Sequence, residues 1–287
     1  MSSIDARYIV ITAVKNEERF IGEALCSMTA QSVKPLEWVI VNDGSTDSTR
    51  KIIKGYARKN PWIRLIDVED SRRSRGGHLV KLFCHGFSKI RARDFDFIVK
   101  LDGDLSFEPG FFERAFSHLA ENPRLGITSG ISHICSGGVL VEEKSARGHT
   151  LGACKIYRKE CFEEIGGLVQ AMGWDGIDEI KARMKGWEAA PVPGLKVIHL
   201  RPEGKATGTF ASGKERGRGS YFMGYHPLFF AFRAAKNIIK SPLDGVGMIT
   251  GYLGAALTGS GRIEDPEFIK FLRTNQLRKL LMLKHKV

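Results

Sequence analysis

The chain has 287 residues, of which 43% are hydrophobic and 26% charged, a composition that excludes a disordered chain and suffices for one large domain or a domain with an appendage. The net charge of +12 arises in the last third: residues 1–180 hold 25 Lys and Arg against 25 Asp and Glu, and residues 181–287 hold 19 against 7. The five cysteines are odd in number and form neither a C-x-x-C pair nor zinc-ligand spacing, which excludes a disulfide-stapled secreted scaffold. Because the first residues also lack a signal-peptide pattern, we expect a cytoplasmic protein.

Apolar runs of strand length alternate with helix-period segments through the first half of the chain. The expected strands are Tyr8–Ala13, Leu36–Val41, Ile63–Val68, Phe95–Leu101 and Leu125–Ile131. The expected helices between them are Glu17–Ala30, Thr46–Lys59, His78–Ile90 and Pro109–Glu121. This order predicts an α/β fold with a mostly parallel central sheet.

The pattern loosens in the second half of the chain. The expected elements there are a loop at Ser132–Gly148, a strand at Leu151–Tyr157, a helix at Lys159–Ile165, a helix at Asp175–Gly186 and a strand at Leu195–Leu200. Residues 204–220 are rich in Gly, Lys, Arg, Ser and Thr, which predicts a mobile loop. Residues 221–287 are expected to form an amphipathic, basic, helical C-terminal extension.

Polar side chains follow the ends of three expected strands. They are Asn16 and Glu17 after the first strand, Asp43 at the end of the second, and Lys100, Asp102 and Asp104 at the end of the fourth. Ligands of open parallel sheets bind beyond the carboxyl ends of the strands, so we expect these side chains to contact the substrate. Asp102 and Asp104 are suited to a hard divalent cation, which would neutralise a diphosphate. For each motif taken singly, a polar turn with a helix cap is an equal alternative.

Taken in order, these motifs resemble the family 2 glycosyltransferases of the GT-A fold. The resemblance covers about residues 8–200 and rests on Ile9–Glu18, Val39–Thr49, Asp102-Gly103-Asp104, Ile165-Gly166-Gly167 and an Asp175 that precedes Gly186-Trp187 by eleven residues. It implies a catalytic domain over residues 1–203, with a nucleotide-sugar half at about 1–104 and an acceptor half at about 105–203.

The resemblance also implies an inverting transfer from a nucleotide-diphosphate sugar to an acceptor hydroxyl, with Mn²⁺ or Mg²⁺ as cofactor. Asp43 would then bind the nucleobase and ribose, and Thr12 and Ala13 would line the same pocket. A basic side chain in the loop after the third strand, such as Arg75, either reaches the phosphates or belongs to a solvated loop.

Three residues are implied as metal ligands. Asp104 would be the main ligand, and Asp102 would contact the ribose or the metal. His199, at the end of the last expected strand, is a further candidate because a late histidine completes the metal shell in some GT-A enzymes.

The general base of the family is the Asp of a Glu-Asp pair at the start of the last helix of the domain. The matching pair here is Trp174-Asp175, so the glutamate of the family is absent, and Asp178 and Glu179 are the alternative bases one turn further on. Inverting transfer requires a carboxylate within hydrogen-bond reach of the acceptor hydroxyl. Trp174 either stacks on a sugar or packs in the core.

The basic last third of the chain indicates a polyanionic partner, which is a nucleic acid or an anionic membrane. A nucleic-acid-binding module without catalytic activity is disfavoured, because the aromatic residues of segment 221–232 cluster with Leu and Met. A sugar-phosphate nucleotidyltransferase is disfavoured because Ala13–Phe20 contains no glycine for a phosphate loop.

The longest uncharged stretch of the extension, Gly245–Gly261, has 17 residues of which six are glycine, so we expect no membrane span. We expect residues 221–287 to lie instead on the inner face of an anionic membrane, where the enzyme meets a lipid-linked or glycan acceptor. The alternative is that these residues cap the catalytic domain or form a homo-oligomer interface.

Overall fold

The computed structural model describes residues 6–69, 77–143, 148–201 and 209–284. The chain forms two compact units: the first comprises residues 1–170 and 185–202, and the second comprises residues 171–184 and 203–287. One boundary between the units falls at residues 202 and 203. The structure adds segment 171–184, which was expected in the acceptor half, to the second unit.

The first unit is built on a nine-stranded sheet. Its strands are β1 (Tyr8–Val14), β2 (Glu37–Asp43), β3 (Ile63–Val68), β4 (Phe97–Leu101), β5 (Leu105–Ser106), β6 (Leu125–Ser136), β7 (Val139–Glu142), β8 (Cys154–Arg158) and β9 (Glu188–His199). They follow the order β3-β2-β1-β4-β8-β6-β9-β5, with β7 paired to β6. Strands β3, β2, β1 and β4 are parallel, as is the pair β6 and β9, and β8 is antiparallel to both of its neighbours. The predicted mixed α/β fold with a mostly parallel sheet is confirmed.

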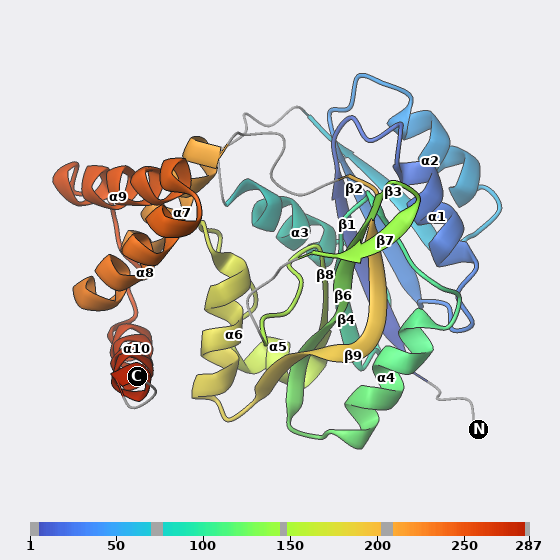
Figure 1. The fold of residues 1–287 in the computed structure, drawn as a ribbon. Coiled ribbons are helices and arrows are strands. Elements are labelled where there is room, and N and C mark those ends of the chain that lie inside the picture. The colour runs from blue at the N-terminus through green and yellow to red at the C-terminus, as the bar shows by residue number, and fades with distance from the viewer. Residues whose placement is uncertain (1–5, 70–76, 144–147, 202–208, 285–287) are drawn as a thin grey trace. The chain divides into compact units, whose positions relative to one another are not determined.

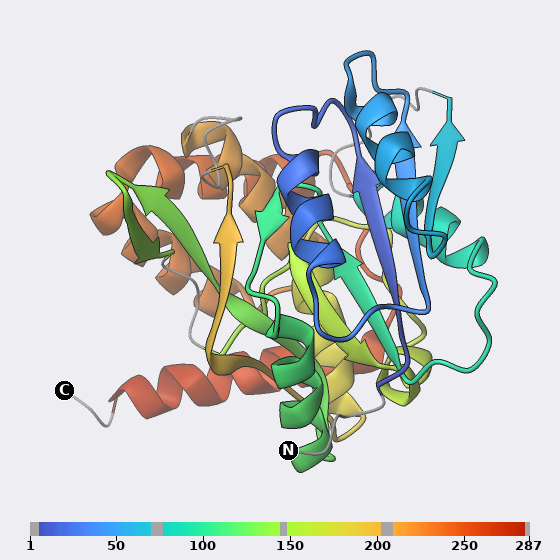
Figure 2. The same ribbon diagram turned by 90° about the vertical axis from the view of Figure 1, so that its right-hand side faces the viewer.

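Helices cover both faces of this sheet. They are α1 (Ile21–Thr29), α2 (Thr49–Ala57), α3 (His78–Ser88), α4 (Phe111–Glu121) and α5 (Lys159–Glu164). The ribbon views show α1, α2 and α4 on one face and α3 with α5 on the other (Figures 1 and 2). Alternate residues of β2 serve the two layers: Trp38 and Ile40 belong to the core under α1, and Val39 and Val41 pack against Leu82 of α3.

The second unit consists of helices. They are α6 (Trp174–Met184), α7 (Thr209–Phe222), α8 (Pro227–Lys240), α9 (Pro242–Leu257) and α10 (Pro266–Lys284). The predicted helical C-terminal region is confirmed. Among the described residues, none of these helices is both long and apolar enough to cross a bilayer.

Helix α7 corrects the predicted loop over residues 204–220, since residues 209–220 are helical. Its glycines lower the intrinsic helix propensity, which is the signal the sequence shows. Packing against α9 requires glycine on both helices. A Cβ at Gly217 of α7 would collide with the Met248 carbonyl of α9, and a Cβ at Gly251 of α9 would collide with the Lys214 carbonyl of α7. The two backbones are in direct contact, and only glycine permits this approach.

The segment Ser132–Gly148, expected to be a loop, contains a β-hairpin. Strand β6 continues to Ser136 because its second half pairs with β9, where Ser132 lies opposite Val197. Strand β7 then pairs back onto β6, with His133 opposite Glu142. The pairing that orders the segment comes from a strand more than fifty residues away, so local pattern could not indicate it.

Candidate functional site

The carboxyl ends of β2, β1 and β4 are neighbours in the sheet, and the loops that follow them interlock. Asn16 has a φ of 55° and bridges two loops: its backbone N–H donates to Ser45 Oγ (3.0 Å), and its side-chain oxygen accepts from the Thr46 N–H (2.9 Å). The Glu17 N–H donates to Thr49 Oγ1 at 2.7 Å. Asn16 therefore holds the rim of the site together, and its contact with substrate stays a prediction.

Asp43 ends β2 with its side chain 1% exposed. Its Oδ2 lies 2.9 Å from His78 Nε2 and 3.4 Å from Lys15 Nζ, which compensate the buried carboxylate. Thr12 is also buried, and its hydroxyl accepts a hydrogen bond from the Trp38 indole at 2.9 Å. The side chain of Thr12 is thus engaged in the core, while Ala13 beside it is half-buried.

Lys100 and Asp102 form an internal pair at the end of β4. Lys100 Nζ lies 2.5 Å from Asp102 Oδ1 and donates to the Gly152 carbonyl at 2.8 Å. Burial raises the pKa of Asp102, and the Lys100 ammonium acts in the opposite sense. The ammonium predicted to contact substrate therefore has Asp102 as its partner in this structure, and the metal-ligand roles of Asp102 and Asp104 stay predictions.

Two features place Asp104 at the centre of the site. A Cβ at Gly103 would lie 2.9 Å from Val14 Cγ1, so the tight turn between the two aspartates requires glycine. Strand β5 begins directly after Asp104, and Leu105 pairs with His199 of β9. The Leu200 N–H donates to the Asp104 carbonyl at 2.9 Å, which fixes the end of β9 beside the aspartate.

The Asp104 carboxylate contacts the His199 ring and the Arg201 guanidinium. Its Oδ2 lies 3.7 Å from His199 Nε2 and accepts from Arg201 Nε (3.1 Å) and Nη2 (2.9 Å). Arg201 Nη2 also donates to Glu17 Oε1 at 2.7 Å. Burial raises the pKa of Glu17, and Arg201 opposes that shift. Glu17 Oε2 is buried and has no hydrogen-bond partner among the described residues.

Glu143 lies on the other side of the His199 ring. Its Oε2 is 3.4 Å from His199 Nδ1 and accepts from Ser132 Oγ at 2.5 Å. A carboxylate at one ring nitrogen commonly orients a histidine whose other nitrogen binds a metal. The hairpin that carries Glu143 is the one that the sequence indicated as a loop, and this residue was not predicted.

The donor set fits a divalent ion that arrives with a diphosphate. Within the described ranges, no group of three or more His, Cys, Asp and Glu side chains could hold a metal ion. Asp104 and His199 offer one oxygen and one nitrogen ligand close together. Mg²⁺ is often bound by one or two carboxylates together with substrate phosphates. A metal at Asp104 would thus depend on phosphate oxygens for the rest of its shell.

The predicted bases lie on α6, in the second unit. Asp175 is half-buried, whereas Asp178 is 1% exposed and its Oδ1 accepts from the Glu179 N–H at 2.6 Å. Trp174 is buried, which favours packing over sugar stacking. The roles of both aspartates stay predictions. Arg75 lies outside the described residues.

Four residues at the site were not predicted: Lys15, His78, Glu143 and Arg201. Lys15 follows β1 directly, so the rule that pointed to Asn16 and Glu17 also points to it. Arg201 follows His199 by two residues, and its position after a strand is the one signal it carries. His78 and Glu143 reach the site through tertiary structure, which no local pattern indicates.

A family model for glycosyl transferase family 2 matches residues 9–172. EpsH of Bacillus subtilis is 25% identical over 172 residues, covering 58% of this chain and 45% of EpsH. The poly-beta-1,6-N-acetyl-D-glucosamine synthase of Staphylococcus epidermidis is 25% identical over 120 residues, covering 42% of this chain and 27% of the synthase. The chain thus spans less than half the length of these curated relatives.

Solved structures share the fold. The mannosyltransferase PcManGT of Pyrobaculum calidifontis, in complex with GDP-Man and Mn²⁺, has a TM-score of 0.56 and 19% identity, covering 96% of this chain and 80% of its own. Residues 1–349 of S. aureus TarS, in complex with UDP-GlcNAc, have a TM-score of 0.57 and 18% identity, covering 75% of this chain and 65% of that one. The predicted resemblance is confirmed, and the chain belongs to glycosyl transferase family 2.

Proposed function

We propose that the protein is an inverting, divalent-metal-dependent glycosyltransferase that moves a sugar from a nucleotide-diphosphate sugar to an acceptor hydroxyl in polysaccharide or glycan synthesis. The observation that carries the proposal is Asp104, a buried carboxylate beside His199 and Arg201 at the same sheet edge as Asp43. The complexes of PcManGT and TarS, with GDP-Man and UDP-GlcNAc, support a donor of this class. The poly-N-acetylglucosamine synthase supports a role in polysaccharide synthesis.

The proposal assigns a role to each site residue of the first unit. Asp43 binds the nucleobase and ribose, and Asp104 with His199 holds Mn²⁺ or Mg²⁺. A bound divalent ion would stabilise the negative charge of the departing diphosphate. Glu143 keeps the His199 ring oriented, and Lys100 neutralises Asp102 beside the metal position.

Asp175 is the proposed base, because it is half-buried and can be approached by an acceptor, whereas Asp178 is almost fully enclosed. The base removes the proton of the acceptor hydroxyl as the hydroxyl oxygen attacks the anomeric carbon. Inversion follows from attack on the face opposite to the leaving diphosphate. The departing diphosphate leaves with the bonding electron pair.

Turnover tests the proposal directly. The protein is incubated with UDP- and GDP-sugars and Mn²⁺ or Mg²⁺, with water as the surrogate acceptor hydroxyl, and release of the nucleoside diphosphate by hydrolysis of the donor is measured. We expect release from at least one donor, loss of release on chelation of the metal, and loss in Asp104→Asn. Release that is insensitive to chelation and to Asp104→Asn would contradict the metal site.

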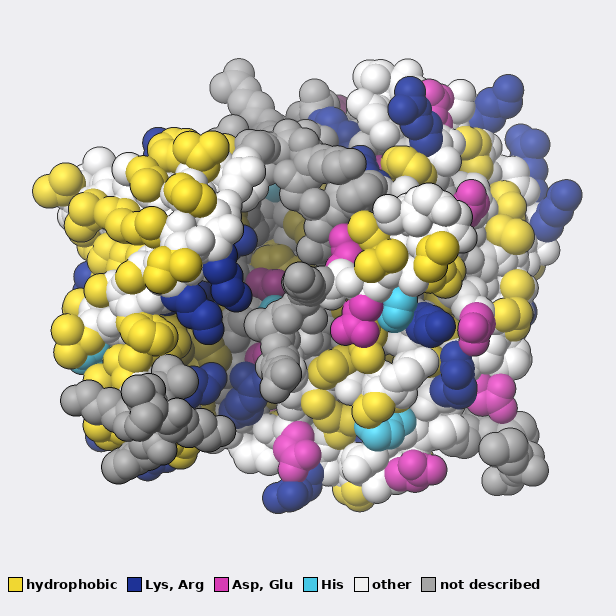
Figure 3. Space-filling model, viewed as in Figure 1, with side chains coloured by type: hydrophobic (Ala, Val, Ile, Leu, Met, Phe, Trp, Pro, Cys, Tyr) yellow, Lys and Arg dark blue, Asp and Glu magenta, His cyan; other side chains and the backbone are white. Residues whose placement is uncertain are grey.

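We further propose that the second unit binds an anionic membrane surface from the cytoplasmic side. Large apolar side chains are exposed along one face of α8 and one face of α9, at helical spacing: Leu228, Phe232 and Ile239 on α8, and Leu243, Val246, Leu253 and Leu257 on α9. Figure 3 shows these helices covered with hydrophobic side chains, with Lys and Arg among them. Exposed apolar faces with bases beside them are typical of interfacial helices.

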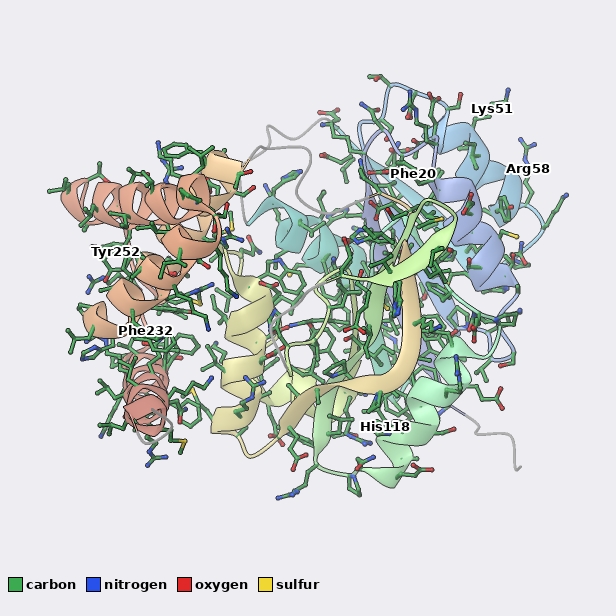
Figure 4. The ribbon with its side chains drawn as sticks, viewed as in Figure 1. Phe20, Lys51, Arg58, His118, Phe232 and Tyr252 are labelled. Carbon is green, nitrogen blue, oxygen red and sulfur yellow. The ribbon has the colours of Figure 1, made fainter. Side chains whose placement is uncertain are left out.

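Vesicle flotation tests this surface. We expect the protein to float with vesicles that contain phosphatidylglycerol and not with phosphatidylcholine alone. The double variant Lys236→Glu/Lys240→Glu should lose binding, because each base near an anionic surface contributes about 1 kcal/mol. Lys51→Glu on α2, combined with Arg58→Glu at the C-cap of α2, is the matched control, since both side chains extend into solvent from the first unit (Figure 4). Failure of the unaltered protein to float would favour the oligomer interface.

A pocket of about 670 Å³ beside α10 supports a lipid-linked acceptor. Its lining combines the apolar Ile269 and Leu277 with the bases Lys270 and Arg273 and the acids Glu264 and Asp265. The apolar walls suit a lipid chain, and the two bases offer partners for a phosphate beside the two acids. Ile269→Asp should raise the KM for a polyprenyl-phosphate-linked acceptor and leave donor affinity unchanged. An unchanged KM would remove the pocket from the acceptor path.

A further inference from the structure

Arg201 has three contacts that converge on the proposed metal position. Two of its nitrogens donate to the same atom, Asp104 Oδ2, at 2.9 and 3.1 Å, and one of them also donates to Glu17 Oε1 at 2.7 Å. The guanidinium carbon lies 5.3 Å from the centre of the Phe20 ring, which Figure 4 labels at this edge of the sheet. The guanidinium is held by a strand end, a loop and an aromatic ring.

Arg201 engages the Asp104 oxygen that lies near His199, the other side chain proposed to hold the metal. Asp104 Oδ2 is the carboxylate oxygen that lies 3.7 Å from His199 Nε2. A divalent ion shared by Asp104 and His199 would therefore lie next to the guanidinium. The two cations would repel each other and would compete for the same carboxylate oxygen. The Arg201 contact and the metal contact are thus mutually unfavourable.

The exposures of the three side chains show how the contact can open. Asp104 and Glu17 are 9% and 15% exposed, whereas Arg201 is 45% exposed. The long arginine side chain can move toward solvent without unpacking the core. A nucleoside diphosphate beside the metal would offer the guanidinium a planar, bidentate anionic partner in exchange for the carboxylates.

We propose that Arg201 closes the metal position in the donor-free protein and releases it when a diphosphate arrives, so that metal and nucleotide bind as a coupled pair. The inference rests on the proposed metal-dependent function and adds that the metal and the nucleotide bind cooperatively. A metal alone must displace Arg201 from the Asp104 and Glu17 carboxylates, whereas a metal with a nucleotide gives the guanidinium a new partner. Each ligand therefore raises the affinity of the other, as linkage requires.

Manganese binding tests the coupling without reference to turnover. The Mn²⁺ affinity is measured by electron paramagnetic resonance, alone and with saturating UDP or GDP, for the unaltered protein, Arg201→Gln, Arg201→Lys and Arg7→Gln. Arg7 is the matched control, because it forms a two-nitrogen ion pair with Asp96 in the same unit, away from the site. Circular dichroism confirms that each variant is folded.

We expect Arg201→Gln to bind Mn²⁺ about tenfold more tightly than the unaltered protein without nucleotide, and to lose most of the enhancement that the nucleotide produces. Arg201→Lys should lie between them, since lysine keeps the charge but not the two-nitrogen contact. Arg7→Gln should match the unaltered protein. Unchanged or weaker nucleotide-free binding in Arg201→Gln, with coupling intact in the unaltered protein, would overturn the inference alone. If the unaltered protein binds no Mn²⁺ even with nucleotide, the metal-dependent function fails as well.

Discussion

The two units of this protein differ in how they pack their helices and in how many of their large apolar side chains they leave exposed. In the first unit every residue of β2 and β4 is buried, and Trp38, Phe111 and Phe116 are among the largest enclosed side chains. In the second unit α7 and α9 are held by glycines in backbone contact, and large side chains such as Ile239 and Leu257 are 85% and 88% exposed. The second unit thus joins α7 and α9 through glycines, encloses a small cluster around Phe230 and Met248, and exposes other large apolar side chains of α8 and α9. Figure 4 labels one side chain of each kind in the second unit. Tyr252 stacks on Phe230 inside the unit, whereas Phe232 is exposed.

The largest expected effect is a loss of turnover, which would show that the second unit supplies a catalytic residue. Asp175→Asn should reduce turnover by about 10²–10⁴-fold, because the amide cannot accept the acceptor proton, and donor affinity should be unchanged. The kcat and the calorimetric donor affinity check this. A variant Asp178→Asn that is inactive beside a nearly normal Asp175→Asn would move the base one turn along α6.

The close packing of α7 against α9 can be tested with two glycine substitutions on α9, one at the contact and one away from it as a control. Gly251→Ala places a Cβ against the α7 backbone and should destabilise this unit by about 1–3 kcal/mol. A Cβ at Gly254 has no atom within 4 Å, so Gly254→Ala should stabilise the unit by about 0.5–1 kcal/mol through its higher helix propensity. Denaturant unfolding measures both, and equal effects would contradict close α7–α9 packing.

The stability of the first unit depends in part on a buried carboxylate, Glu37, whose removal should lower the free energy of unfolding. Glu37, at the start of β2, accepts from the backbone N–H groups of Arg91 and Ala92 at 2.7 and 3.0 Å and pairs with Arg64. Burial alone would raise its pKa, but these hydrogen bonds outweigh burial and hold the pKa below its ordinary 4.5.

A lowered carboxyl pKa stabilises the fold above the ordinary pKa, and the stabilisation is lost as the pH falls through the folded pKa. Glu37→Gln should therefore cost about 1–3 kcal/mol at pH 7 and progressively less below about pH 4.5. Unfolding curves across this range check the sign. A cost that grows as the pH falls would contradict the proposed hydrogen bonds.

The smallest expected effect concerns the exposed apolar face. Ile239→Ser and Leu257→Ser should change the free energy of unfolding by less than about 0.5 kcal/mol. Leu101→Ala in the first unit, where the side chain is fully buried, should cost about 2–5 kcal/mol. If the two serine variants are as costly as Leu101→Ala, these side chains pack against protein, and the membrane proposal loses its basis.

The same contrast explains what the sequence could predict. Strand Ile63–Val68 matches its prediction, and β1, β2 and β4 match within two residues, because each of these strands has its own local hydrophobic pattern. Helix α7 was missed because its glycines act through α9, and β7 was missed because β6 is extended by β9. At the site, Asp43 and Asp104 follow from the strand-end rule. Glu143 and His78 do not, because tertiary pairing alone brings them there.

The most direct test of the account separates the two aspartates by what they bind. Calorimetry with UDP and GDP, with and without Mn²⁺, is performed on the unaltered protein, Asp43→Ala and Asp104→Asn. We predict that Asp43→Ala weakens nucleotide binding under both conditions, whereas Asp104→Asn removes only the enhancement that Mn²⁺ produces. The account is contradicted if Asp104→Asn keeps the full Mn²⁺ enhancement, or if no nucleotide binds the unaltered protein under either condition.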